Sequence, residues 1–266
     1  MNDSLANVEK ECEADSIQSA ISLRGVSKFF AASGQHRRPL YRELLRARKE
    51  SVSCDAKAAL AAVDLDIPRG AAVAILGPNG AGKSTLLRTI AGIYQPSEGS
   101  VDVAGRVACF FEAGVGIAPT LALEDNIHLY GAILGLGRED TSAGLEQILT
   151  FAELQDQRRT CVEHLSFGTQ QRLFFSIMLY AMQRRSADVF LFDEWLAGAD
   201  LRFRRKGQEA LEAIHDPEMT SIYASHDLEC LESMCETAVY VKSGGIRLVG
   251  PFAEVAETYR SDQGMP

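Results

Sequence analysis

Two kinds of hydrophobic pattern alternate along this chain. Short apolar or alternating runs predict strands, because a strand buries every second side chain, or every side chain when both faces of its sheet are covered. Longer segments with apolar residues three and four positions apart predict amphipathic helices. The expected strands are 21–26, 60–67, 71–76, 101–103, 107–111, 188–192, 221–224 and 238–241, and the expected helices are 85–90, 123–134, 144–154, 171–182, 202–214 and 228–235.

The order of these elements predicts an α/β fold. Strands and helices alternate before residue 113 and after residue 185, whereas the segment between them is mostly helical. Such an order is typical of an α/β core that carries a helical insertion.

Composition and charge exclude several classes of protein. The chain has 266 residues, enough for one large domain. It has no apolar run long enough to span a bilayer, and residues 1–15 are polar and acidic, which predicts a cytosolic protein without a signal peptide. Six cysteines without CxxC spacing predict reduced thiols rather than disulfides or a zinc site. The net charge of −9 disfavours general nucleic-acid binding.

Residues 77–85, with the sequence GPNGAGKST, carry the strongest chemical signal. They match the phosphate-binding pattern GxxxxGK[ST], between an expected strand and an expected helix. Glycines allow successive backbone N–H groups to turn toward phosphates, and the N-terminus of the following helix favours anions. Lys83 is expected to reach the outer phosphates and the Ser84 hydroxyl to hold Mg²⁺. The expected nucleotide-binding residues of this loop are Asn79, Gly80, Ala81, Gly82, Lys83, Ser84 and Thr85.

A second chemical landmark follows the expected strand 188–192. Asp193 and Glu194 stand at its carboxyl end, where open α/β sheets place their sites. We expect Asp193 to organise Mg²⁺ and Glu194 to orient or deprotonate the water that attacks a phosphoryl group. The structural alternative is a strand that ends in a helix N-cap.

Two further motifs resemble those of the ATP-binding cassette (ABC) ATPases. Residues 165–172, with the sequence LSFGTQQR, resemble the LSGGQ signature, and residues 225–227, Ser-His-Asp, resemble the segment that holds the switch histidine. The resemblance implies ATP hydrolysis with Glu194, His226 and Lys83 as catalytic residues. The alternatives are a plain N-cap for Ser166 and a buried or capping role for His226. The residues implied to contact the nucleotide of a partner chain are Ser166, Phe167, Gly168 and Thr169.

The resemblance covers residues 21–260 and is greatest to the ATPases of polysaccharide exporters. The run 193–200 looks like the Walker B motif and D-loop of that family, with Asp200 in the D-loop, and Glu112 lies where its Q-loop is found. An insert between the first two strands and the ending at 250–259 are also similar. By this resemblance, Phe30 stacks on adenine, with Phe29 the second choice. The implied metal ligands are Ser84, Asp193 and Glu112, and Glu112 also contacts the nucleotide.

The resemblance also implies a domain organisation. The fold is expected to be a P-loop NTPase (ABC ATPase) core with an inserted helical subdomain and an N-terminal antiparallel β region. The expected parts are a flexible tail at 1–20, an ATP-binding core with the β region at 21–112, a helical signature subdomain at 113–185 and the second part of the core at 186–266.

Residues 36–50 differ from the acidic average of the chain. Six Arg and Lys side chains surround apolar ones at helical spacing, which predicts a short basic amphipathic helix. It either packs its apolar side on the domain, or it contacts anionic lipid headgroups or a charged, lipid-linked cargo. The sequence does not choose between these roles.

Partners follow from the resemblance. A single cassette implies a head-to-tail homodimer that encloses two ATP molecules with Mg²⁺, and a separate transmembrane permease docked over the helical insertion and the Glu112 loop. The resemblance also implies a peripheral subunit at the cytoplasmic face of the bacterial inner membrane. The implied cargo is a lipid-linked glycan, which the permease mainly handles. Some relatives carry a C-terminal carbohydrate-binding domain; because this chain stops soon after Tyr259, no glycan selection through such a domain is expected.

Departures from the family pattern leave other functions open. Phe167, Thr169 and Glu112 replace a glycine and two glutamines, which favours slow hydrolysis or tighter coupling to transport. The alternatives are an ABC exporter ATPase for another lipid or amphiphile, a soluble ABC ATPase that acts on DNA or ribosomes, and a nucleotide-gated binding protein without useful hydrolysis. The soluble ATPase would need a coiled-coil insertion or two cassettes in the chain, and this sequence has neither.

Overall fold

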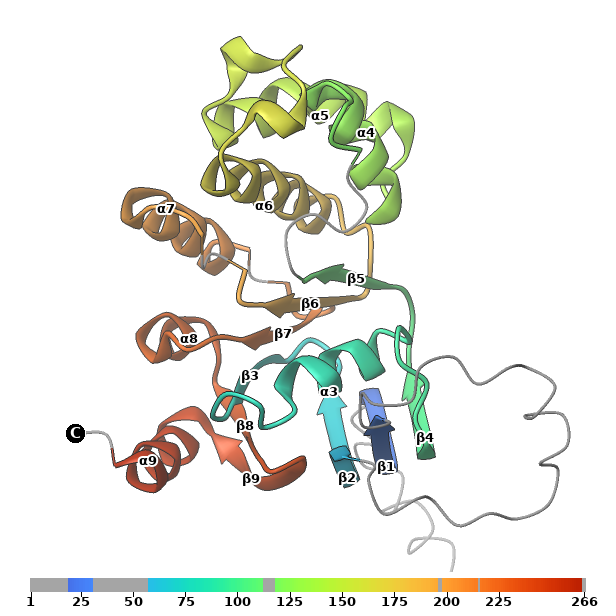
Figure 1. Ribbon diagram of the computed structural model, residues 1–266, viewed down its shortest axis with the longest axis vertical. Coiled ribbons are helices and arrows are strands. Elements are labelled where there is room, and N and C mark those ends of the chain that lie inside the picture. Colours follow the sequence, from blue (N-terminus) through green and yellow to red (C-terminus); the bar gives the residue numbers. More distant parts are fainter. Residues whose placement is uncertain (1–18, 31–56, 112–117, 196–197, 215, 265–266) are drawn as a thin grey trace, which may run out of the picture.

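Two β-sheets organise the chain in a computed structural model that describes residues 19–30, 57–111, 118–195, 198–214 and 216–264 (Figure 1). The smaller sheet is antiparallel, with the strand order β2-β1-β4. Its strands are β1 (Ser19–Phe30), β2 (Lys57–Pro68) and β4 (Glu98–Val103). β1 mixes buried positions with half-buried and exposed ones, as is typical of an antiparallel sheet with one covered face.

The larger sheet has six strands in the order β5-β6-β7-β3-β8-β9. All neighbours are parallel except β8 and β9, which pair as an antiparallel hairpin at one edge. Its central strands are mostly apolar and almost entirely buried, because both faces of the sheet are covered. The strands are β5 (Val107–Phe110), β6 (Val189–Asp193), β7 (Thr220–Ala224), β3 (Ala72–Leu76), β8 (Thr237–Lys242) and β9 (Gly245–Pro251).

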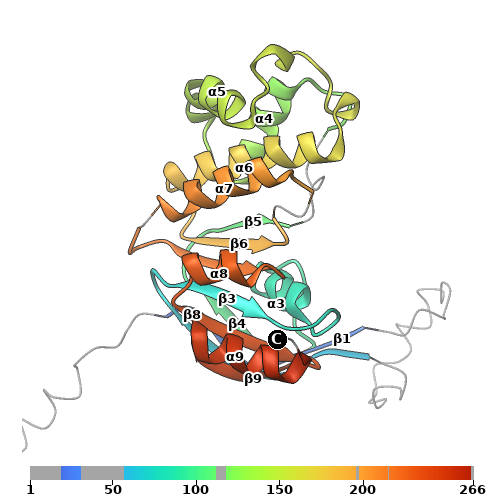
Figure 2. The same ribbon diagram turned by 90° about the vertical axis from the view of Figure 1, so that its left-hand side faces the viewer.

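Each face of the larger sheet belongs to a different hydrophobic core. One core lies between this sheet, α3 (Lys83–Ile90) and the antiparallel sheet. The other core includes α7 (Leu201–Glu212), α8 (Leu228–Met234) and α9 (Phe252–Gln263), which Figure 2 shows stacked along the sheet. The buried strands are thereby held on both sides.

Three helices form a separate layer beyond the β5 and β6 edge of the sheet (Figures 1 and 2). They are α4 (Leu123–Ile133), α5 (Arg138–Ala152) and α6 (Phe167–Gln183), with short 3₁₀ turns at Gln155–Gln157 and Val162–His164. In α6 every residue from Leu173 to Met182 is buried, because this helix packs between the outer helices and the sheet. It therefore connects the helical layer to the core.

The predicted fold class is confirmed, and so is each strand and helix predicted within the described residues, with shifted bounds. The sequence patterns missed β9 and α9 and placed the start of α5 six residues late, at 144 instead of 138. None of the helices in the described part of the chain is both long and apolar enough to cross a membrane. The basic helix predicted at 36–50, the Glu112 loop and nearly all of the predicted N-terminal tail lie outside the described residues.

Candidate functional site

A cleft of about 380 Å³ opens at the carboxyl edge of the larger sheet. It is formed where the loop after β3 meets the ends of β6 and β7 and the facing parts of β1 and β2. Five separate stretches of the chain therefore meet at one place. The lining residues are Phe30, Ala58, Ala59, Asn79, Gly80, Ala81, Gly82, Lys83, Ser84, Thr85, Asp193, Glu194 and His226.

The loop between β3 and α3 has a backbone that glycine makes possible. Gly80 and Gly82 have φ angles of 75° and 113°, in the left-handed region. A Cβ atom at Gly82 would also stand 2.6 Å from the carbonyl oxygen of Ala59. No side chain caps the N-terminus of α3, so its first N–H groups remain available to an anion in the cleft.

Lys83 lies at the base of this loop and is only 8 % exposed. Its Nζ donates hydrogen bonds to the carbonyl oxygens of Gly77, at 2.7 Å, and Pro78, at 3.3 Å. Burial lowers the pKa of the Lys83 ammonium, while the nearby carboxylates of Glu194 and Asp193 oppose this shift. The group is a cation held by neutral acceptors, which a phosphate oxygen can replace.

Glu194 directly follows β6 and has an unusual backbone. Its φ is 51°, a left-handed conformation that costs free energy in a residue with a side chain, and its N–H donates to the carbonyl of Ala224. Burial raises the pKa of the Glu194 carboxyl, although His226 and Lys83 act in the opposite direction. Its Oε1 lies 3.2 Å from Nε2 of His226 but is buried without a hydrogen-bond partner in the described part of the chain. The site thus contains a proton acceptor with unused capacity.

His226 stands in the turn that follows β7. The Ser225 hydroxyl accepts a hydrogen bond from the Asp227 N–H, and the Asp227 carboxylate caps α8 by accepting from the Cys230 N–H. His226 itself is half exposed and takes no part in the cap. The turn therefore leaves its imidazole directed at Glu194.

Oxygen ligands for a divalent cation come from two elements. The Ser84 hydroxyl at the start of α3 and the Asp193 carboxylate at the end of β6 line the same cleft. Hydroxyl and carboxylate oxygens are the donors that Mg²⁺ prefers, and Mg²⁺ usually completes its shell with phosphate oxygens and water. Within the described ranges, no three His, Cys, Asp or Glu side chains form a complete metal site of their own. The donor set therefore fits Mg²⁺ that arrives with a phosphate ligand.

Phe30 lies at the rim of the cleft, 38 % exposed, whereas Phe29 does not line it. The edge of Tyr94 packs against the Phe30 ring, with 5.3 Å between the centroids and 75° between the planes. Lys28 lies near both rings, with Nζ at 5.4 Å and 5.8 Å from the two centroids. Sequence reasoning missed Tyr94, and the only available signal was an aromatic residue soon after the end of α3.

The predicted signature residues do not reach the cleft of their own chain. Ser166 is the N-cap of α6, and its hydroxyl accepts from the Thr169 N–H at 3.2 Å. Asp200 caps α7 in the same way, accepting from the Phe203 N–H at 2.9 Å. Phe167 and Gly168 form the first turn of α6. The structure thus groups the predicted site residues into the cleft and the starts of α6 and α7, while Glu112 lies outside the described residues.

Comparison with known proteins adds a family to this geometry. Residues 60–197 match the family model described as ABC transporter. The chain is 33 % identical over 216 residues to the O-antigen export system ATP-binding protein RfbB of Myxococcus xanthus, covering 81 % of this chain and 48 % of that protein. It is 32 % identical to RfbB of Klebsiella pneumoniae, with 74 % and 79 % covered, and 32 % identical to the teichoic acids export ATP-binding protein TagH of Bacillus cereus, with 76 % and 36 % covered. The chain thus spans about half the length of the Myxococcus relative.

Solved structures with the same fold are more distant in sequence. An ATP-binding subunit of an ABC transporter superposes with a TM-score of 0.69 at 19 % identity, covering 93 % of this chain and 94 % of that one. A dimeric, post-hydrolysis ATP-binding cassette bound to ADP and Pi gives 0.68 at 21 % identity, covering 87 % and 98 %. These similarities concern the fold alone.

Proposed function

The chain belongs to the ABC transporter family, and we propose that it is the ATP-hydrolysing subunit of an exporter that moves a lipid-linked polysaccharide across a bacterial cytoplasmic membrane. The observation that carries the ATPase proposal is the cleft, in which a phosphate-binding loop faces Glu194 and His226. The names of the relatives carry the proposal for the cargo.

ATP is proposed to bind with its phosphates on the loop 79–85 and its adenine on Phe30. The free N–H groups at the start of α3 would receive phosphate oxygens, and Lys83 would exchange its carbonyl partners for the outer phosphates. Mg²⁺, when bound, supplies positive charge that neutralises the phosphates. Ser84 and Asp193 would hold it, and the predicted third ligand, Glu112, remains a proposal.

Hydrolysis is proposed to proceed through Glu194. The carboxylate orients a water molecule toward the terminal phosphorus and accepts a proton as the water oxygen attacks and the bond to the leaving phosphate oxygen breaks. A raised pKa makes Glu194 a stronger proton acceptor than a solvent-exposed carboxylate, and its Oε1 has no competing hydrogen bond in the described residues. His226, with Nε2 3.2 Å from the Glu194 carboxylate, would hold that carboxylate or contact the terminal phosphate.

A second copy of the chain is proposed to complete each site. Ser166, Gly168 and Asp200 are exposed or half-buried at helix starts that do not line the cleft of their own chain. In a head-to-tail dimer these helix starts would close over the nucleotide of the partner, where N–H groups and the helix dipole favour phosphate.

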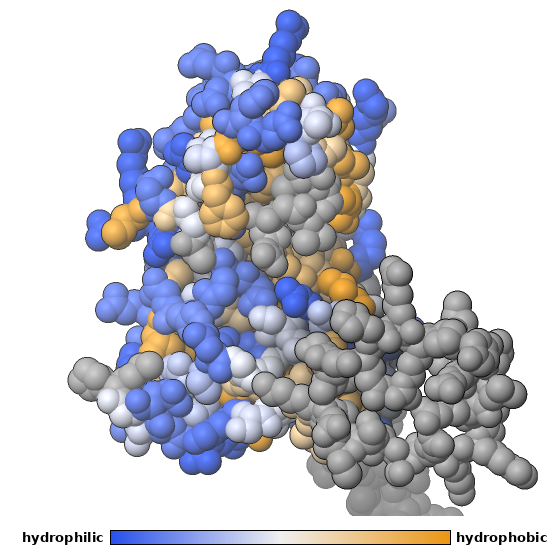
Figure 3. Space-filling model, viewed as in Figure 1, coloured by the Kyte–Doolittle hydropathy of each residue, from blue (hydrophilic) through white to orange (hydrophobic). Residues whose placement is uncertain are grey.

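A separate permease is proposed to dock on the helical layer at the cytoplasmic face of the membrane. Leu121, Leu129 and Ile133 are large apolar side chains that are exposed in and just before α4. Figure 3 shows apolar side chains gathered on this side of the helical layer. Contiguous exposed apolar patches are typical of protein interfaces, which supports this face as the docking surface.

The ATPase proposal is tested with Glu194→Gln, and Glu257→Gln on the exposed side of α9 serves as the matched control. Phosphate release should fall by about 100-fold or more in the first variant, because general-base catalysis contributes that much, while ATP affinity changes little. Light scattering should then find a dimer that depends on ATP and Mg²⁺. Unchanged hydrolysis in Glu194→Gln, or loss of ATP binding, would refute the assigned role.

The cargo proposal needs a separate measurement. The chain is reconstituted with its permease in vesicles, and ATPase activity is measured with a lipid-linked polysaccharide and with the same lipid carrier lacking the glycan. Stimulation by the glycan-bearing lipid alone supports the proposal. Equal stimulation by the bare lipid would instead favour an exporter of another lipid or amphiphile.

A further inference from the structure

The start of α6 and the residues just before α7 approach each other more closely than side chains would normally allow. A Cβ atom placed on Gly168 would stand 2.7 Å from the carbonyl oxygen of Gly198. A Cβ atom placed on Gly198 would stand 2.5 Å from Cε1 and 2.8 Å from Cδ1 of Phe167. Real Cβ atoms do not come this close to other heavy atoms. At Gly168 the obstacle is backbone, so glycine is required there, whereas a side chain at residue 198 would have to displace the Phe167 ring from its present position.

Backbone conformation does not explain the glycine at residue 168. Gly168 is not among the glycines with positive φ in the described residues, and it lies in the first turn of α6, where alanine would favour the helix more. The requirement comes instead from the neighbouring chain segment. At Gly198 that neighbour is chiefly the ring of Phe167.

We propose that Phe167 and Gly198 are a matched pair of positioning residues. The ring of Phe167 is 57 % exposed, and the edge that is covered lies against Gly198. A bulky residue at 167 therefore fits because residue 198 has no side chain. The pair sets the spacing between the signature segment 165–169 and the segment 198–200 that leads into α7.

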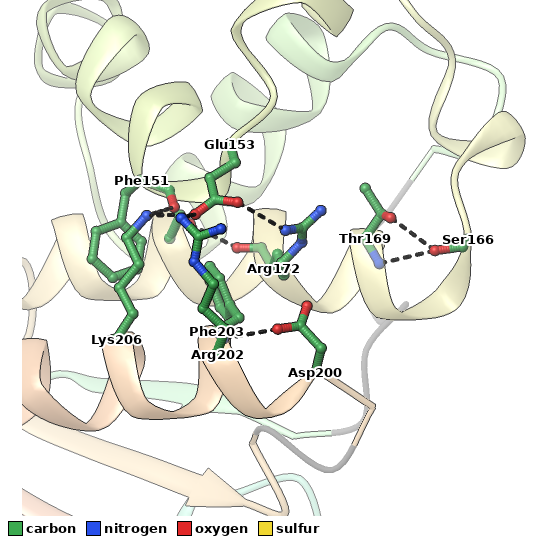
Figure 4. Close-up of polar contacts among 10 residues, drawn as sticks. Phe151, Glu153, Ser166, Thr169, Arg172, Asp200, Arg202, Phe203 and Lys206 are labelled. Atoms are coloured by element: carbon green, nitrogen blue, oxygen red, sulfur yellow. Dashed lines mark hydrogen bonds and ion pairs between the residues drawn. The ribbon is translucent and has the colours of Figure 1, made fainter.

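Contacts further along α6 and α7 hold the two helices together behind this pair. Glu153, directly after α5, forms ion pairs with Arg172 of α6 and Lys206 of α7, each at 3.3 Å (Figure 4). Arg202 of α7 lies 3.8 Å from the same carboxylate. Lys206 also donates to the carbonyl oxygen of Phe151. Individual pairs at the surface contribute little, but this group links α5, α6 and α7 at one point. The bodies of the two helices are thus joined, and the Phe167–Gly198 contact fixes how their first turns meet.

Local caps make each helix start rigid, so a change at one is transmitted to the other. Ser166 and Asp200 each accept a backbone N–H three residues later, at the starts of α6 and α7 (Figure 4). Gly198 comes four residues after Glu194 along the chain. Displacement of Gly198 would therefore displace the backbone at 166–168 relative to the catalytic segment.

The functional consequence rests on the proposed function. If Ser166 and Gly168 contact the nucleotide of a second copy, the Phe167–Gly198 pair determines whether these two residues are correctly positioned for that contact. Binding of ATP to the cleft of the same chain would not depend on it, because neither Phe167 nor Gly198 lines that cleft. The pair should thus affect turnover more than nucleotide affinity.

The test compares Gly198→Ala, Phe167→Ala and the double variant with Gly250→Ala as matched control. The control adds the same methyl group in β9, where a Cβ atom would meet nothing closer than 3.9 Å. We expect Gly198→Ala to lower kcat about five- to tenfold with KM for ATP within about twofold, and the double variant to regain the kcat of Phe167→Ala. Gly250→Ala should behave as the unmodified chain.

A second readout does not require ATPase activity. Trp195 is the only tryptophan of the chain, it is 3 % exposed and it lies three residues before Gly198. Acrylamide should quench its fluorescence more strongly in Gly198→Ala, and the double variant should return to the protected value. If the unmodified chain does not hydrolyse ATP, the proposed function fails while this readout still tests the pair. A double variant as impaired as Gly198→Ala in both readouts, or no effect of Gly198→Ala in either, overturns the matched pair.

Discussion

A second aromatic residue, Tyr94, helps to hold the ring of Phe30 in place at the rim of the cleft. Phe30 is the last residue of β1 and is partly exposed, so its ring needs support from outside the strand. Tyr94 supplies this support through a T-shaped contact with Phe30. The guanidinium of Arg88 lies over the Tyr94 ring, 6.0 Å from its centroid. Tyr94 is therefore a positioning residue for whatever stacks on Phe30.

Replacement of Tyr94 by alanine should weaken nucleotide binding without slowing chemistry. An aromatic pair contributes about 0.5–1.5 kcal/mol, so KM for ATP should rise roughly two- to tenfold while kcat stays nearly constant. Tyr94→Phe keeps the ring and should bind ATP as the unmodified chain does. An unchanged KM in Tyr94→Ala would show that Phe30 is held by other contacts.

Sequence patterns identified most of the cleft residues, but only the family resemblance, and not the strand pattern, ranked Phe30 above Phe29. Strand alternation should place Phe29 and Phe30 on opposite faces, yet the register of β1 against β2 shifts between Lys28 and Phe29. Such an irregularity depends on pairing with a strand far along the chain. Tyr94 was missed for the same reason, since it meets Phe30 through space and not through any local pattern.

At the scale of elements, one carboxylate, that of Asp262, links α9 to β8 and β9. Asp262 on α9 accepts a hydrogen bond from the Tyr240 hydroxyl of β8 and forms ion pairs with Lys242, at 2.8 Å, and Arg247, at 3.0 Å. Lys242 above all, with help from Tyr240 and Arg247, lowers the pKa of the Asp262 carboxyl. The ionised form is therefore the one that stabilises the folded chain.

Removal of this charge should reduce stability in a pH-dependent manner. A lowered pKa stabilises the fold above the ordinary pKa of the carboxyl, near 4, and the contribution is lost as pH falls through the lowered value. Asp262→Asn should therefore unfold about 1–3 °C below the unmodified chain at pH 7, and the gap should close toward pH 3. Thermal unfolding followed by circular dichroism measures both, with Glu257→Gln on the same helix as control. An equal gap at both pH values would assign the effect to packing instead of charge.

Periodicity predicted the central strands well but missed one edge strand. The central strands β3, β6 and β7 are almost entirely buried and mostly apolar, and they were readily predicted. The edge strand β9 contains two glycines and a proline and alternates between half-buried and exposed positions, so no apolar run identifies it. The first turns of α5 are similarly polar, with an Arg-Glu-Asp start. These segments are placed by pairing and packing with β8 and α6, which a local pattern does not contain.

At the scale of the whole molecule, the cleft and the signature segment belong to different layers. The cleft lies at the carboxyl ends of central strands of the larger sheet. Ser166, in contrast, caps α6 of the helical layer, which Figure 1 shows beyond β5 and β6. In the proposed head-to-tail dimer, the cleft of one chain and the signature segment of its partner would together form each site. The predicted boundaries between these layers remain predictions, since residues 112–117 lie outside the described ranges.

Two inactive variants should restore activity when they are mixed. Lys83→Ala disables the cleft, and Ser166→Arg blocks the helix start, so each homodimer is inactive. A mixed dimer has one working site of two, because the intact cleft of one chain meets the intact helix start of the other. Random pairing makes about half of the dimers mixed, so the mixture should show about a quarter of the normal ATPase rate. Phosphate release from the mixture measures this, and the separate variants are the controls. A mixture no more active than its components would mean that the half-sites do not combine between chains.

The clearance at Gly198 also constrains the order in which two substitutions could have arisen during evolution. A side chain at residue 198 would compete with the Phe167 ring for the same space, whereas glycine there leaves room for either a small or a large residue at 167. Glycine at 198 is thus the permissive residue, and the route that gains it before the phenylalanine avoids an intermediate in which the two side chains clash. We therefore expect a large residue at 167 to occur together with glycine at 198 in related chains.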